Sequence, residues 1–89
     1  MKGIKLENLE EAQIDERQIR TWPIWEKEIS RFDWEYDSDE ECYILSGEVR
    51  VETPEGEVII KAGDFVTFQN GLKCVWDIKS PIKKHYNFK

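Results

Sequence analysis

Hydrophobic and polar residues alternate in short stretches along most of the chain. The clearest case follows Gly47, where Val49, Val51 and Thr53 alternate with charged residues, as in a strand that is buried on one face. Further strands are predicted at 32–36, 42–45, 58–60, 65–68, 73–78 and 82–88. About seven short strands at this spacing predict an all-β fold, either a sandwich or a barrel.

Turn residues separate the predicted strands. Pro54-Glu55-Gly56 predicts a hairpin, because proline presets its φ angle and glycine accepts a positive one. Ala62-Gly63-Asp64 and Asn70-Gly71 predict two more turns, and Ser80-Pro81 is expected to break the last strand region in two.

Residues 1–21 are predicted to be partly helical. Asn8 is a candidate N-cap, with Glu11 three residues later as in a capping box. The helical segment is expected to end before Trp22-Pro23, since a residue that precedes proline avoids helical angles.

Several predicted strands are apolar on both faces. In the run from Cys42 to Leu45, both the even and the odd positions are apolar. One face fills the interior and the other needs a cover. The cover is either the N-terminal segment, with Trp22, Ile24 and Trp25, or a second subunit, so a homodimer is one expected state.

Charge and hydropathy exclude several classes of partner. The 89-residue chain has 13 basic and 19 acidic residues, a net charge of −6, which argues against nucleic-acid binding. No apolar run approaches the ~20 residues that a membrane span needs. The opening residues 1–5 are not followed by the apolar stretch of a signal peptide, so a cytoplasmic location is expected, with Cys42 and Cys74 as reduced thiols.

Two segments combine a fixed spacing with turn glycines. Six residues separate Glu40 from Gly47. Gly63 and Gly71 flank a predicted strand, and Cys74 follows the second glycine by three positions. These spacings resemble the two sequence motifs of cupins.

A wider set of residues narrows the resemblance. It comprises 22–26 (WPIWE), 32–36 (FDWEY), the CYIL run before Gly47, Gly63-Asp64 with Val66, and Lys84-His85-Tyr86. With these residues the chain resembles the small single-domain cupins of the ureidoglycine aminohydrolase cupin-domain family, in the RmlC-like cupin superfamily. The resemblance implies one domain over 1–89, with a jelly-roll β-barrel over 22–89. It also suggests hydrolysis of a ureido compound at a bound metal.

The metal ligands of that family are largely absent. The first-motif histidine positions fall on Trp34 and Tyr36, or on Asp33 and Glu35 with the longer spacing. The second-motif histidine is replaced by Cys74, so only Glu40 remains in kind. We therefore expect no cofactor. A divalent metal held by Glu40 and Cys74 is the less favoured alternative.

Strand parity predicts which side chains line the barrel. If Glu40 points inwards, so does Cys42, and the same holds for Cys74 with Trp76 and for Lys84 with Tyr86. The predicted ligand-binding residues are Trp34, Tyr36, Glu40, Cys42, Cys74, Trp76, Lys84 and Tyr86. Glu40 and Cys74 are also the catalytic candidates. His85, the single histidine, has the opposite parity and is expected on the surface.

Each of these residues also has a purely structural interpretation. The aromatic rings could simply fill the barrel, Glu40 could bond to Tyr36, and Lys84 could form a salt bridge at the rim. The favoured function is metal-independent binding of a small, polar or nitrogen-containing molecule. The alternatives are a hydrolase with an atypical metal site and a non-catalytic dimeric interaction module.

Overall fold

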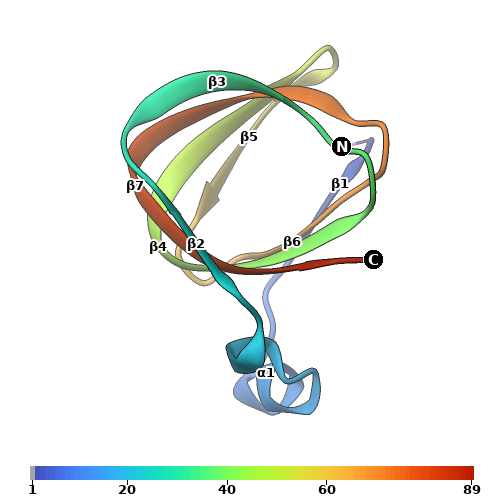
Figure 1. The fold of residues 1–89 in the computed structure, drawn as a ribbon, viewed down its shortest axis with the longest axis vertical. Coiled ribbons are helices and arrows are strands. Elements are labelled where there is room, and N and C mark those ends of the chain that lie inside the picture. Colours follow the sequence, from blue (N-terminus) through green and yellow to red (C-terminus); the bar gives the residue numbers. More distant parts are fainter. Residues whose placement is uncertain (1) are drawn as a thin grey trace.

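The computed structural model describes residues 2–89. Met1, the first residue of the predicted domain, lies outside the described residues. Strand pairing is antiparallel throughout, and the strands wrap into a small barrel with a helical appendage beneath it (Figure 1). The elements are β1 Ile4–Glu7, α1 Glu11–Glu16, the 3-10 helix η1 Ile19–Thr21, β2 Ile24–Lys27, β3 Ser30–Glu35, β4 Glu40–Thr53, β5 Gly56–Lys61, β6 Phe65–Phe68 and β7 Lys73–Phe88.

Two long strands, β4 and β7, pair along almost their whole length and form the frame of the barrel. The first half of β4 also pairs with β6, and its second half with β5. The first half of β7 pairs with β3, and its second half with β2. The register of β4 against β7 shifts at three points between Ile44 and Val49, which marks a bulged stretch, and a bulge bends a strand. Each long strand therefore contributes to both walls of the barrel.

The all-β fold with a short N-terminal helical segment is confirmed, and two strand boundaries differ from the prediction. β7 runs through Ser80-Pro81 without a break, because its pairing with β4 shifts register there and the extra residues are accommodated as a bulge on β7. β4 likewise joins two predicted strands, and Gly47 lies within it at a φ of 93°.

The N-terminal segment contains a strand that the sequence did not predict. β1 pairs with β6, so the barrel also includes residues that precede Trp22. The helix α1 begins two residues later than expected: Glu10 is its N-cap and forms a capping box with Gln13, in place of Asn8 and Glu11. The predicted end before Trp22-Pro23 is confirmed, since η1 ends at Thr21.

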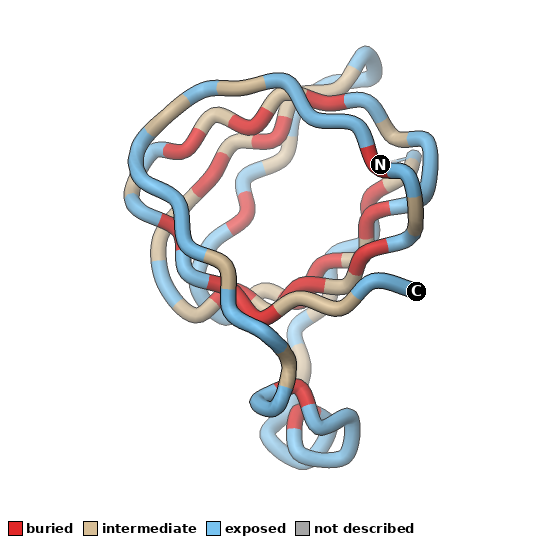
Figure 2. Tube along the Cα trace, viewed as in Figure 1, coloured by how far each residue is buried: buried red, intermediate tan, exposed pale blue. Residues whose placement is uncertain are grey.

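Buried residues fall into two clusters. The larger fills the barrel, and Figure 2 shows its buried positions along β4, β6 and β7, whereas β3 is mostly exposed. The smaller lies outside the barrel, where Ile14 and Ile19 pack on Phe65, with Trp22 and Tyr43 at its edge. The N-terminal segment is therefore a cover for part of the outer face.

This cover changes the expected positions of two residues. His85 has the predicted outward parity, but it is only 6% exposed, and its Nδ1 lies 2.9 Å from the carbonyl oxygen of Trp22. The prediction of a surface histidine is wrong, because the N-terminal segment lies over it. Trp25 was expected in the cover and instead packs inside the barrel. No helix among residues 2–89 is long and apolar enough to cross a membrane.

Candidate functional site

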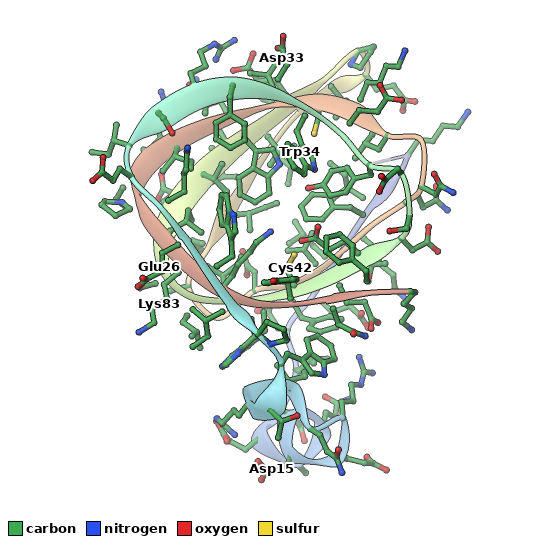
Figure 3. All side chains as sticks on the ribbon, in the orientation of Figure 1. Asp15, Glu26, Asp33, Trp34, Cys42 and Lys83 are labelled. Carbon is green, nitrogen blue, oxygen red and sulfur yellow. The ribbon has the colours of Figure 1, made fainter. Side chains whose placement is uncertain are left out.

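A cavity of about 640 Å³ lies between β2, β3, the start of β4 and β7. Pockets for small ligands typically measure roughly 300–1,000 Å³. Its aromatic lining residues are Trp25, Phe32, Trp34, Tyr36, Trp76, Tyr86 and Phe88. Figure 3 shows Trp34 pointing from β3 into the barrel, while its neighbour Asp33 points outwards.

A buried ion pair lies at the cavity. The ammonium Nζ of Lys84 is 2.8 Å from Oε2 of Glu40, and the two residues are 6% and 3% exposed. The Cys42 thiol donates to the same carboxylate oxygen at 2.7 Å, and Lys84 Nζ is 3.3 Å from Cys42 Sγ. Glu40 and Cys42 share the inner face of β4, and adjacent β7 supplies Lys84, so strand pairing assembles the trio.

Two indole rings flank the ammonium of this pair. Lys84 Nζ lies 4.9 Å from the ring centroid of Trp25 and 4.8 Å from that of Trp76. Both distances are within the range of cation–π attraction, which is strong when the cation is desolvated. Lys84 is therefore held on three sides, by a carboxylate and two aromatic faces.

The surroundings of the pair favour protonated groups. Burial disfavours the charged form of Lys84, but Cys42 and Glu40 outweigh burial and raise the pKa of this lysine above its ordinary value. Burial also raises the pKa of the Cys42 thiol strongly, although the nearby Lys84 acts in the opposite direction. Tyr36 has a pKa far above its ordinary value, chiefly through burial and then through Glu40. The ammonium stays charged, while the thiol and the phenol stay neutral.

The ion pair keeps hydrogen-bonding capacity for a ligand. Both contacts to the Glu40 carboxylate use Oε2, and Oε1 accepts no hydrogen bond from any residue in 2–89. An ammonium has three N–H donors, and Lys84 uses two of them, on Glu40 and Cys42. Both residues line the cavity. The site therefore offers an acceptor and a donor side by side.

The structure brings together most of the predicted binding residues. Six of them line the cavity: Trp34, Tyr36, Glu40, Trp76, Lys84 and Tyr86. Cys42 contacts the ion pair. Cys74 lies apart from the cavity lining, in a groove with Thr53 and Pro54, and burial raises its pKa to about 11.

Two of the purely structural roles that the sequence suggested, for Glu40 and for Lys84, are wrong. Glu40 bonds to Lys84 and Cys42, with no hydrogen bond to Tyr36 among the described contacts. Lys84 is not a rim residue, because the pair it forms with Glu40 is buried.

Sequence reasoning missed six residues that line the cavity, and three of them are aromatic: Trp25, Phe32 and Phe88. Phe32 shares strand parity with Trp34, and Phe88 shares it with Lys84, so the alternation along each strand was a usable signal. Trp25 was placed in the outer cover. Only the pairing of Trp25 with Lys84 across β2 and β7 reveals its inward position, and this pairing cannot be read from local sequence.

The residues present do not fit a divalent metal. The Lys84 ammonium lies next to the one carboxylate oxygen that a metal would share with Cys42, and a second cation there would be repelled. Thiolates ligate metals, and burial favours the neutral thiol at both cysteines. Within residues 2–89, no three His, Cys, Asp or Glu side chains cluster in a way that could hold a metal ion.

Comparison with known proteins places the chain in a family. Residues 15–86 match the model of the EutQ-like cupin domain. A DUF861 family protein from Thermotoga maritima, of known structure, is 47% identical over 97% of this chain and 99% of its own, with a TM-score of 0.94. No curated protein matches the chain significantly.

More distant structures share the fold. The EutQ protein of Clostridium difficile is 20% identical over 73% of this chain, with a TM-score of 0.67, and the match spans 52% of that protein. A protein of unknown function of the DUF861 family from Pseudomonas syringae is 19% identical over 74% of this chain and 29% of its own, also with a TM-score of 0.67. The predicted cupin fold is thereby confirmed, and the chain belongs to the family of EutQ-like cupin domains.

Proposed function

We propose that the barrel binds, without a metal, a small electroneutral molecule that carries a hydrogen-bond donor next to an acceptor. The observation that carries the proposal is the buried Glu40–Lys84 pair, which leaves Oε1 and one ammonium N–H free beside the cavity. A planar amide matches both groups, because its N–H donates to Glu40 and its carbonyl oxygen accepts from Lys84.

The charge of the site supports an uncharged ligand. Glu40 and Lys84 already neutralise each other, so an anion or a cation beside them would bring an uncompensated charge into the desolvated part of the cavity. The other charged lining residues, Glu26, Lys27 and Asp33, are exposed to solvent. The aromatic walls favour flat groups, which stack on the rings. A ureido group has this planar donor–acceptor pattern, which is consistent with a ligand like that of the ureidoglycine aminohydrolase cupins.

The test compares three probes of similar size and different charge: butanamide, butanoate and butylammonium. In titrations followed by NMR, we expect butanamide to shift the indole N–H signals of Trp25 and Trp76 saturably. We expect the two charged probes to bind at least about tenfold more weakly, a difference of ~1.4 kcal/mol. Weaker binding of butanamide than of either charged probe, or no binding of any probe, would refute the proposal.

Two variants assign the binding to the ion pair. Glu40→Gln and Lys84→Met should each weaken butanamide binding. Glu52→Gln removes a carboxylate from the exposed pair with Arg31, outside the cavity lining, and should leave binding unchanged. Equal losses in all three variants would point to a general effect on folding instead.

The metal-dependent hydrolase has a direct test of its own. Metal content is measured by mass spectrometry on protein purified without chelator, for the wild type, Glu40→Gln and Cys74→Ser. Under the proposed function, metal content is low in all three. Near-stoichiometric metal that falls in both variants would overturn the metal-independent proposal.

A further inference from the structure

The aromatic lining of the cavity continues outwards to its open end. Along β3 and directly after its end, Phe32, Trp34 and Tyr36 follow one another on the inner face, with ring centroids 6.5 and 6.3 Å apart. On β7, Tyr86 and Phe88 do the same at 5.6 Å. Tyr36 is 3% exposed, but Trp34 and Phe88 are 47% and 52% exposed. The two exposed rings therefore line the cavity at its mouth, and Figure 3 shows Trp34 pointing into the barrel.

Both rings are attached to well-anchored backbone. Trp34 lies in β3 opposite Cys74, and Phe88 pairs with Glu40 at the start of β4. The residue after Phe88 is also fixed, since the backbone N–H of Lys89 donates to the carbonyl of Asp39 at 2.9 Å. Two large apolar side chains are thus held exposed beside a cavity. Exposed apolar surface at the rim of a pocket commonly marks a binding surface.

We propose that Trp34 and Phe88 form a second, apolar subsite that binds the hydrocarbon tail of the ligand. The inference rests on the proposed function, because the ion pair would hold the polar head of the same molecule. The natural ligand is then amphiphilic, with a neutral amide-like head and an apolar extension that passes between the two rings. The continuity of the lining from Lys84 to Phe88 favours this occupant.

A series of primary amides tests the subsite: propanamide, pentanamide and heptanamide. Each methylene that reaches the rings should tighten binding about three- to fourfold, from the transfer free energy of a buried CH₂. Trp34→Ala and Phe88→Ala should each flatten this gain, so that the ratio of heptanamide to propanamide affinity falls well below that of the wild type. Ile59→Ala removes an apolar side chain that is 43% exposed and lies outside the cavity lining, so it should leave the gain intact.

The outcomes separate the two proposals. If propanamide binds and longer tails add nothing, the apolar subsite is refuted and the proposed function stands. If no amide binds, the proposed function fails and the subsite fails with it. Light scattering on the same variants tests the alternative occupant of the two rings, a second copy of this chain. A wild-type dimer that both alanine variants convert to monomers would show that the rings bind a second copy, which overturns the subsite.

Discussion

At the scale of single residues, the Glu40–Lys84 pair combines a stability risk with the binding role that we propose for it. Each charge was removed from water, and only the partner, Cys42 and the indole faces compensate for the lost hydration. Such a pair contributes little net stability compared with two apolar residues, so stability alone does not account for it. The pair faces a cavity and keeps an unused acceptor and an unused N–H donor, which is better explained by the proposed recognition of a ligand.

The pair should show strong coupling when its members are replaced. Lys84→Met leaves a buried, unpaired carboxylate, and we expect a loss of about 3–5 kcal/mol in the free energy of unfolding. The double variant Glu40→Gln, Lys84→Met should be destabilised less than Lys84→Met alone. Urea unfolding measures both. The exposed pair of Arg31 and Glu52 is the reference, where Arg31→Met should cost below about 1 kcal/mol.

The buried thiols predict a loss of stability in alkali. The pKa of Cys74 rises from 9.0 to about 11 on folding, so the folded state holds this proton more tightly than the unfolded state. The associated stability is complete below pH 9 and is lost as the pH rises towards 11. Cys42 and Lys84, with raised pKa values, add losses of the same sign.

Cys74→Ser tests this at one residue, because serine does not titrate in this range. Urea unfolding at several pH values from 8 to 11 should show a shallower decline for the variant than for the wild type. Identical declines would mean that Cys74 ionises equally easily in both states.

At the scale of elements, the pairing of β4 with β7 is bulged around Gly47, and a bulge bends the strands that carry it. A Cβ at position 47 would lie 2.0 Å from the carbonyl oxygen of Pro81 on β7. The φ angle of Gly47 is also positive. The spacing from Glu40 to Gly47 was read from the sequence as a turn signal. The structure shows that this glycine instead permits a close approach of two strands where their pairing shifts register.

Two alanine substitutions separate backbone strain from steric clash. Gly63 has the same φ of +93° but open space around it, so Gly63→Ala should cost only about 1–2 kcal/mol. Gly47→Ala adds the clash with β7 and should exceed the ~3 kcal/mol that ordinary substitutions reach. Thermal unfolding of the two variants compares them. Similar losses at both positions would mean that β7 can move aside without cost.

Element by element, period-two alternation predicted the strand regions from β3 onwards, but not β1 or β2, and it predicted half of the cavity lining. Parity along β4 and β7 correctly placed Glu40, Cys42 and Lys84 on the inner face. Parity fixes a face but not a depth along the barrel, so it could not show that Lys84 is buried against Glu40. It also could not distinguish the cavity from the neighbouring groove that contains Cys74, because both lie beside β3.

At the scale of the whole molecule, the outer face of the barrel is covered partly by the chain itself. The sequence left two candidates for this cover, and α1 and η1 fill the role over Phe65, Tyr43 and His85. Ile24, 50% exposed, takes no part in it. The homodimer stays a prediction, and the apolar side chains that remain exposed, with the mouth of the cavity, are the surfaces it would use.

The cover should unfold together with the barrel as one domain. Ile19 is fully buried, in the cluster that joins η1 to β6, so Ile19→Ala should cost about 2–5 kcal/mol through lost burial and a residual cavity. Ile24→Ala, at an exposed site, should change stability by no more than about 0.5 kcal/mol.

The decisive measurement is urea unfolding followed by two probes, tryptophan fluorescence and far-ultraviolet circular dichroism. Coincident transitions for Ile19→Ala would mean that residues 2–21 are part of the cooperative unit, because the loss in the cover would then lower the stability of the whole barrel. An early, separate transition with an unchanged barrel midpoint would make the segment an accessory, and the domain would then be the barrel alone.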